Sequence, residues 1–191
     1  YSLRGNISRL QIVTPELILS PENVDMRVEA NPDTINAYAQ SGDLLLTFTS
    51  SDGVMKLMEK GTELYRQIMH QLEQREIDDK KLREYFPQIA FHIESGRDNP
   101  LSDFLASQSL SYNKVYADLY VSPAGGINGN THIFSLNYDS TLIDTIRFNL
   151  SHDTIGLAFD AQVRNNKQNP QFVFNALAEE LGKYPISFAI F

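Results

Sequence analysis

The stretch Val24-Asp25-Met26-Arg27-Val28-Glu29-Ala30 alternates apolar and charged side chains. Because successive side chains of a β-strand point to opposite faces, this pattern places an apolar row on one face and charged groups on the other. Turn residues follow at Asn31-Pro32-Asp33 and at Ser41-Gly42-Asp43, and further alternating segments follow each turn. Residues 1–50 are therefore expected to form consecutive antiparallel strands, a β-meander.

The same alternation returns between residues 87 and 191. It begins with Ile89, Phe91 and Ile93 and recurs in later rows that are separated by polar turns. A glycine-rich stretch from Pro123 to Asn130 contains the pair Asn128-Gly129, which predicts a hairpin turn. These patterns predict a mainly β protein with a sheet of mostly antiparallel strands.

The period changes between Val54 and Arg75, where apolar residues recur at steps of three and four. That spacing predicts an amphipathic helix, and Ser51 or Asp52 is suited to cap its N-terminus. The apolar stripe of this helix has two interpretations: it packs on the sheet as core, or it covers a partner or a lipid surface. We favour core packing, because the polar side of the helix mixes both charges, whereas helices that lie on membranes tend to be rich in Lys and Arg.

Two shorter helices are also expected. Asp78 is placed to cap a helix that runs to about Tyr85 and ends before Pro87, and Asn99-Pro100 has the residue types that begin a helix near residues 100–107. The expected organisation is a single segment with strands over residues 1–50, a helical insertion over 51–86 and strands over 87–191.

Composition excludes several classes of function. The chain has 16 Lys and Arg against 24 Asp and Glu, and its net charge of -8 argues against nucleic acid as a partner, because a phosphate backbone needs clustered positive charge. It has no cysteine, so disulfides, thiolate metal sites and thiol nucleophiles are impossible. No apolar run approaches the ~20 residues needed to span a bilayer. The chain opens on Tyr1 and stops in a strand pattern at Phe191, so we expect it to be an internal segment of a longer protein.

Polar residues suited to catalysis are present but scattered. The four histidines have no spacing that would bring two of them to one metal ion, and no Gly-x-Ser-x-Gly motif supports a serine nucleophile. Asp118, Asp144 and Asp160 lie on expected strands, and two carboxylates brought together in space would suffice for a glycosidase. The favoured interpretation is that they are the polar members of alternating strands. We therefore expect no enzyme, no cofactor and no metal.

Three segments carry a resemblance to a known family. They are Gly96-Arg97-Asp98-Asn99-Pro100-Leu101-Ser102-Asp103-Phe104-Leu105-Ala106-Ser107, the hairpin unit from Leu142 to Val163, and Asn166-Lys167-Gln168-Asn169-Pro170-Gln171-Phe172-Val173-Phe174. In this order they resemble the translocation and assembly module TamB family, relatives of AsmA, and the likeness runs from about Leu10 to Ala178. It rests on segment order and short phrases and includes no catalytic signature.

The resemblance implies a periplasmic protein of the Gram-negative envelope whose parent chain is anchored in the inner membrane. In that family the sheet curls into a β-taco-like trough with an apolar lining. The roles that the family suggests are phospholipid transfer between the membranes and assembly of outer-membrane proteins. An Omp85-type barrel would be the partner, contacted through other parts of the parent chain.

The apolar rows supply candidates for the lining of such a groove. We expect it to be lined by Val28, Leu46, Phe48, Phe91, Val115, Leu119, Phe134, Ile146, Phe148, Leu157, Phe159, Phe172 and Phe174. The bound molecule would be a phospholipid or another lipid with acyl chains. Two alternatives remain: a closed β-sandwich that serves as a protein-interaction module of the cell envelope, and a carbohydrate-active enzyme.

Overall fold

A computed structural model describes the backbone of residues 1–13, 18–75, 78–139, 141–152, 156–165, 172–180 and 187–190. Side chains are described for the same residues except 9–13, 18–22, 172–180 and 187–190.

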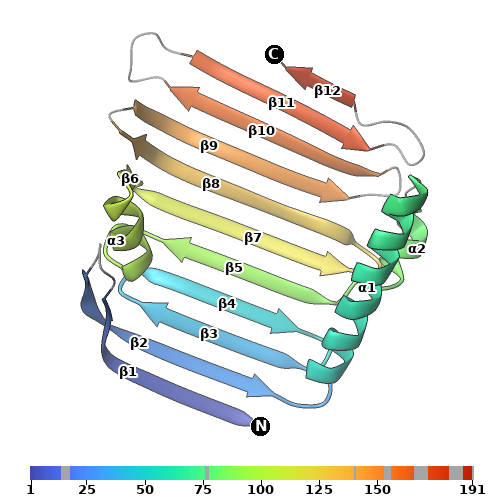
Figure 1. Ribbon diagram of the computed structural model, residues 1–191, viewed down its shortest axis with the longest axis horizontal. Coiled ribbons are helices and arrows are strands. Elements are labelled where there is room, and N and C mark those ends of the chain that lie inside the picture. Colours follow the sequence, from blue (N-terminus) through green and yellow to red (C-terminus); the bar gives the residue numbers. More distant parts are fainter. Residues whose placement is uncertain are drawn as a thin grey trace.

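The described strands form one open antiparallel sheet (Figure 1). Its strands are β1 (Ser2–Val13), β2 (Ile18–Ala30), β3 (Ile35–Ser41), β4 (Leu44–Ser50), β5 (Ile89–Ser95), β6 (Leu110–Ser111), β7 (Lys114–Ser122), β8 (Gly126–Tyr138), β9 (Thr141–His152), β10 (Leu157–Asn165), β11 (Phe172–Glu180) and β12 (Ser187–Ile190). Their spatial order is β1-β2-β3-β4-β5-β7-β8-β9-β10-β11-β12, and the short β6 pairs with β8. Each main strand thus lies beside its neighbour along the chain, and the prediction of a mainly β fold with a curved antiparallel sheet is confirmed.

Helices occupy two of the connections between strands. The β4–β5 connection contains α1 (Val54–Gln74) and α2 (Asp79–Arg83), and the β5–β7 connection contains α3 (Pro100–Ser107). The helical insertion and the short helix near residues 100–107 are therefore present as predicted. The prediction that Ser51 or Asp52 caps α1 was wrong, because the N-cap is Gly53, which makes no side-chain capping bond. Asp52 instead uses its carboxylate to bind lysines, as described below.

The predicted hairpin turn at Asn128-Gly129 is also wrong. Both residues lie inside β8, where Gly129 pairs with Leu119 of β7. The turn closes earlier because Gly126 adopts a positive φ of 72° and the Ser122 hydroxyl accepts a hydrogen bond from the Gly125 N–H at 2.9 Å. A side chain at Gly126 would also collide with the ring of His152, since a Cβ there would lie 2.7 Å from it.

Register assigns the two faces of the sheet. Residues directly opposed in an antiparallel pair share a face, so rows can be followed from strand to strand. One such row consists of Val28, Ala37, Phe48, Phe91, Leu119, Gly129, Leu150 and Phe159. The adjacent row on the other side consists of Arg27, Tyr38, Thr47, His92, Asp118, Asn130, Asn149 and Asp160. We call these sides the apolar face and the polar face.

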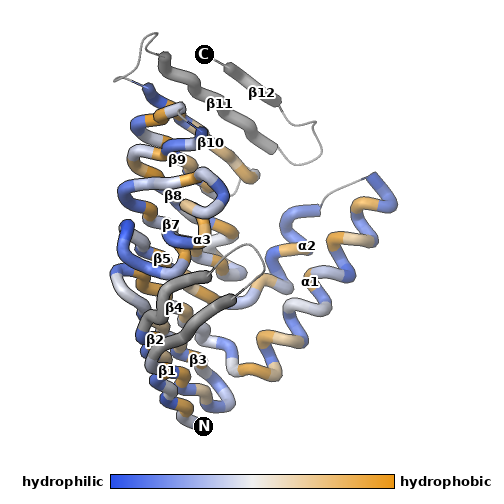
Figure 2. The backbone as a smooth tube through the Cα atoms, turned by 60° about the vertical axis from the view of Figure 1, so that its left-hand side comes forward, coloured by the Kyte–Doolittle hydropathy of each residue, from blue (hydrophilic) through white to orange (hydrophobic). Residues whose placement is uncertain are grey.

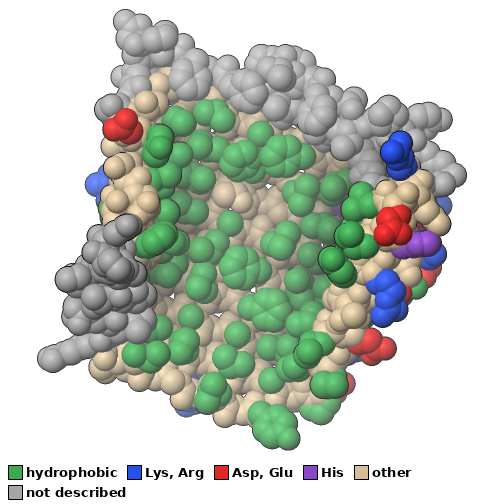
Figure 3. Space-filling view, in the orientation of Figure 1, with side chains coloured by type: hydrophobic (Ala, Val, Ile, Leu, Met, Phe, Trp, Pro, Cys, Tyr) green, Lys and Arg blue, Asp and Glu red, His purple; other side chains and the backbone are tan. Residues whose placement is uncertain are grey.

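The apolar face is only partly buried. The buried hydrophobic residues among those described are Ile35, Val121, Ile146 and Ala161 on this face, together with Phe86 and Tyr112. Phe48, Phe91, Leu119 and Leu150, in the middle of the apolar face, remain partly exposed. Figure 3 shows hydrophobic side chains gathered over the centre of the sheet, open to the viewer. Within the described part of the chain, no second sheet covers this face.

None of the described helices has the length and hydrophobicity needed to cross a membrane.

Candidate functional site: an open apolar trough

The apolar face forms the floor of an open trough. Ten of the residues expected to line a groove share this face: Val28, Leu46, Phe48, Phe91, Val115, Leu119, Ile146, Phe148, Leu157 and Phe159. Two of these side chains, Phe148 and Phe159, stack on adjacent strands with ring centroids 5.8 Å apart and an interplanar angle of 22°. The stacked pair still leaves Phe159 37 % exposed, so part of its aromatic surface remains accessible.

Three of the residues expected to line the groove, Phe134, Phe172 and Phe174, have no described side chain on the apolar face. Phe134 lies on the polar face, because it pairs with Thr145 of β9 and its ring meets that of Tyr116 edge-on at 6.1 Å. Its assignment to the groove is therefore wrong. The backbone register of β11 places Phe172 and Phe174 on the apolar face, but their side chains lie outside the described residues.

Helix α1 forms a side wall of the trough and is not packed on the sheet. Figure 2 shows it leaving the sheet near its N-terminal end and diverging from it toward its C-terminal end. Its exposed apolar residues, called here the α1 stripe, are Val54, Met55, Met58, Tyr65, Ile68, Met69 and Leu72. Met55, Met58 and Tyr65 are 80 %, 64 % and 66 % exposed. The expectation that this stripe packs as core was therefore wrong.

Polar contacts hold α1 in this position. The half-buried and buried residues of the helix form a mixed strip that includes Lys60, Gln67 and Gln71. At the C-terminal end the Gln71 carbonyl oxygen Oε1 accepts a hydrogen bond from the Asp78 N–H at 2.6 Å, which joins α1 to the start of α2. Attachment by this strip leaves most of the apolar side chains free, the reverse of the usual arrangement for a helix on a soluble domain.

Asp52 fixes the N-terminal end of α1. Its carboxylate is buried, at 2 % residue exposure, and receives Lys56 Nζ and Lys60 Nζ at 2.8 Å each and the Gln88 N–H at 2.9 Å. Burial alone would raise the pKa of Asp52, but these hydrogen bonds outweigh it and hold the pKa far below 3.8. The ionised carboxylate thus ties the first two turns of α1 to the segment that enters β5.

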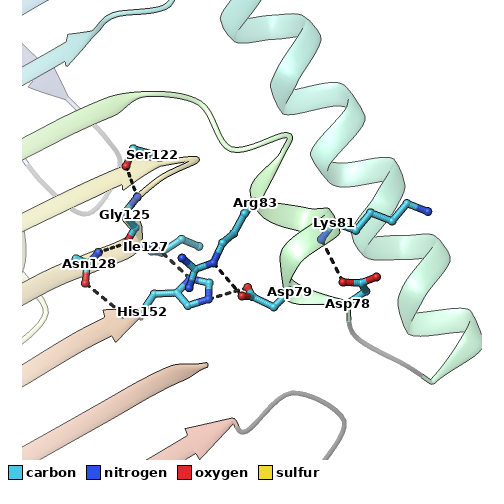
Figure 4. A network of polar contacts seen from close by, with 9 residues as sticks. All are labelled: Asp78, Asp79, Lys81, Arg83, Ser122, Gly125, Ile127, Asn128 and His152. Atoms are coloured by element: carbon cyan, nitrogen blue, oxygen red, sulfur yellow. Dashed lines mark hydrogen bonds and ion pairs between the residues drawn. The ribbon is translucent and has the colours of Figure 1, made fainter. Parts of the chain in front are cut away.

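A second anchor, at α2, is built on His152 (Figure 4). His152 Nε2 lies 2.7 Å from Asp79 Oδ1, and Asp79 Oδ2 lies 2.8 Å from Arg83 Nε. The other ring nitrogen, Nδ1, accepts a hydrogen bond from the Ile127 N–H at 3.3 Å. The ring proton is therefore on Nε2, and this N–H donates a hydrogen bond to Asp79. The His152 side chain is only 5 % exposed, which suits an anchor and leaves little access for a substrate.

A third polar cluster fixes α3 at the opposite strand ends. Asn99 caps α3 by accepting hydrogen bonds from the Leu101 and Ser102 N–H groups at 3.0 Å each. Its Nδ2 donates to Asp43 Oδ1 at 2.6 Å and to Ser95 Oγ at 3.0 Å. Burial raises the pKa of Asp43, but the bonds from Asn99 and from backbone N–H groups outweigh it and lower that pKa. In the segment Gly96–Ser107, Asn99 thus caps α3 and also binds Asp43 in the β3–β4 turn.

The carboxylates considered for glycoside chemistry are not brought together. Asp118 and Asp160 share a row of the polar face but stand three strands apart, about 14 Å at ~4.8 Å per strand, beyond the ~5–10 Å of glycosidase pairs. Asp144 lies on the apolar face, two residues from Ile146. Asp118 instead contacts His92 Nδ1 at 2.7 Å. Among the described residues no group of three or more His, Asp or Glu side chains could hold a metal ion.

Comparison with known proteins adds no relative. No protein-family model matches the chain, and no curated protein and no solved structure matches it.

Proposed function

We propose that the chain is a non-enzymatic segment of a TamB-like, AsmA-related envelope protein, and that its trough shields the acyl chains of phospholipid. In this proposal the parent chain is anchored in the inner membrane and spans the periplasm, working with an Omp85-type barrel in lipid transfer or outer-membrane protein assembly. The single observation that carries the proposal is the apolar face, which runs across eight neighbouring strands and has no covering layer among the described residues.

The energetics favour a lipid occupant. Burying a methylene group is worth ~0.8 kcal/mol, so a sixteen-carbon acyl chain removed completely from water would gain about 12 kcal/mol, and an open floor that covers one side of the chain supplies part of this gain. Exposed apolar patches of this extent are rare on soluble domains and usually mark a binding surface. No residue has to perform covalent chemistry for such a role.

The sandwich alternative is less well supported. A closed sandwich requires a second sheet against the apolar face, whereas the described strands all belong to one sheet. A protein that binds to the apolar face would use the same surface as a lipid. The experiment below therefore identifies the captured molecule.

Adjacent residues on opposite faces provide the test. In the complete protein, a photo-crosslinking amino acid replaces Phe148 or Phe159 on the apolar face, and Arg147 or Asp160 on the polar face serves as the matched control. We expect phospholipid, identified by mass spectrometry, to be captured from Phe148 and Phe159 only. Capture only from Arg147 and Asp160, or only of protein from every position, would contradict the proposal.

A further inference from the structure

The α1 stripe is an apolar surface that the protein itself leaves uncovered. Its residues follow one another at spacings of one, three or seven and fall on one side of a helix with 3.6 residues per turn, and none of them is charged. Three of the four methionines of the chain, Met55, Met58 and Met69, belong to this stripe. Methionine is flexible and polarisable, and surfaces rich in it adapt to ligands of variable shape.

The stripe continues the floor of the trough. Figure 3 shows hydrophobic side chains extending from the centre of the sheet to the flank of α1 that borders it. The anchors at Asp52 and at Gln71 hold the helix ends by polar contacts and leave this flank free. Floor and flank together make two sides of one apolar space.

Charge favours a neutral apolar occupant over an anionic surface. The α1 sequence contains three basic residues, Lys56, Lys60 and Arg66, and three acidic ones, Glu59, Glu63 and Glu73. Two of the lysines are already paired with Asp52. The helix therefore lacks the excess of positive charge that draws amphipathic helices to anionic bilayers.

We propose that the α1 stripe is the second wall of the lipid site and contacts the acyl chains that lie on the sheet floor. The inference rests on the proposed function and extends it to a helix for which the sequence predicted core packing. Acyl chains vary in length and unsaturation, and a methionine-rich wall can follow these differences where a rigid β-surface cannot.

Photo-crosslinking in the complete protein tests the contact. The crosslinking residue replaces Tyr65 or Ile68 on the stripe, Arg66 on the neighbouring polar side of α1 as the matched control, and Phe148 on the floor. The probe is phosphatidylcholine, added to the purified protein as vesicles that are then removed before irradiation. We expect Tyr65, Ile68 and Phe148 to capture the lipid, and Arg66 to capture at least about fivefold less.

The outcomes separate this inference from the proposed function. Capture from Phe148 without capture from Tyr65 and Ile68 overturns the inference and leaves the floor in place. No capture from any position overturns both. Capture from the stripe only while vesicles are present, or equal capture from Arg66, means that α1 contacts a bilayer surface, and this also overturns the inference.

A pair of substitutions provides an independent measurement. Met58→Gln with Tyr65→Gln makes the stripe more polar at side chains that are already exposed, so the thermal midpoint should not change measurably. We expect the phospholipid that co-purifies per protein molecule to fall about fivefold, and the control Glu59→Gln to leave it unchanged. Undiminished lipid in the double variant would contradict the role of the stripe.

Discussion

Asp52 attaches the N-terminal end of α1 to the segment that enters β5. Its buried carboxylate binds Lys56, Lys60 and the Gln88 N–H. In Asp52→Asn the ion pairs are lost and the amide cannot serve all three donors, so we expect a loss of about 2 kcal/mol in the free energy of unfolding, below the usual value for buried pairs because Lys56 is exposed. Urea denaturation measures the change. Glu59→Gln, an exposed change on the same helix, should alter the free energy by less than about 0.5 kcal/mol.

Asp52 also predicts a pH dependence. Because its pKa is lower in the folded chain than the ordinary 3.8, the folded state is favoured by the ionised carboxylate at all pH values well above 3.8. This contribution falls as the pH decreases below that value, where the unfolded chain takes up the proton first. Urea midpoints measured from pH 6 to about pH 3 should therefore decline less steeply in Asp52→Asn than in the wild type. Parallel declines in the two proteins would show that other carboxylates dominate.

For some single residues, the face of the sheet and the long-range partners could not be predicted from the sequence. Phe134 was expected to line the groove because it belongs to an alternating segment, but a period of two cannot say which face of the sheet such a residue occupies. Pairing with Thr145 and the ring contact with Tyr116 decide it. The bonds of Asp52 to Gln88 and of His152 to Asp79 join residues far apart in the sequence, so no local spacing could indicate them.

At the scale of the element, two glycines of the α1 region have opposite expected effects. A Cβ at Gly53 would lie 1.8 Å from the Pro32 carbonyl oxygen, so Gly53→Ala must displace either the β2–β3 turn or the start of α1. We expect a loss of about 2 kcal/mol. Gly61, in the middle of α1, has nothing within 4 Å of its Cβ position, and Gly61→Ala should gain about 0.5–1 kcal/mol. Thermal or urea unfolding measures both, and similar shifts for the two would refute the packing of Gly53.

The α2 anchor can be tested by hydrogen exchange. In Asp79→Ala, the Nε2 proton of His152 and the guanidinium of Arg83 lose their shared acceptor. We expect a cost of about 1–2 kcal/mol that appears as faster amide exchange in α1 and α2, with little change in β3 and β4. His92→Ala, which removes a partly exposed pair with Asp118 on the polar face, should leave exchange in the helices unchanged. Uniformly faster exchange throughout the sheet would mean that Asp79 supports the whole fold.

The helices show which part of an element a sequence determines. Steps of three and four gave the extent of α1, and Asn99-Pro100 gave the start of α3, because capping and periodicity are local. The orientation of the apolar side of α1, in contrast, is not determined by local sequence. It depends on contacts such as the one between Asp52 and Gln88, which are 36 residues apart, so the usual rule that the apolar side faces the core failed.

For the whole molecule, the order of strands follows the order of the chain, and this is why the fold class could be predicted from turns and alternation alone. The sequence did not reveal what shields the apolar face from water. Alternation indicates that a face avoids water, but it does not distinguish a second sheet, a helix or a ligand as the means. The open face is thus a property of the assembled sheet.

A charge placed in the middle of that face should interrupt lipid binding without affecting the other side. Leu119 lies on the apolar row in β7, and the next residue, Tyr120, is exposed on the polar face. Leu119→Lys puts an ammonium group where an acyl chain would lie, and removing that charge from water beside hydrocarbon is costly. We expect phospholipid per molecule of complete protein, measured by native mass spectrometry, to fall about tenfold, whereas Tyr120→Lys should retain it. Because Leu119 is only partly buried and a lysine stem can lie along an apolar surface, both variants should remain folded by circular dichroism. If both variants keep the same amount of lipid as the wild type, the acyl chains do not cross the middle of the apolar face. If both lose lipid equally, binding does not distinguish the two faces of the sheet, and the assignment of the lipid to the apolar face is wrong.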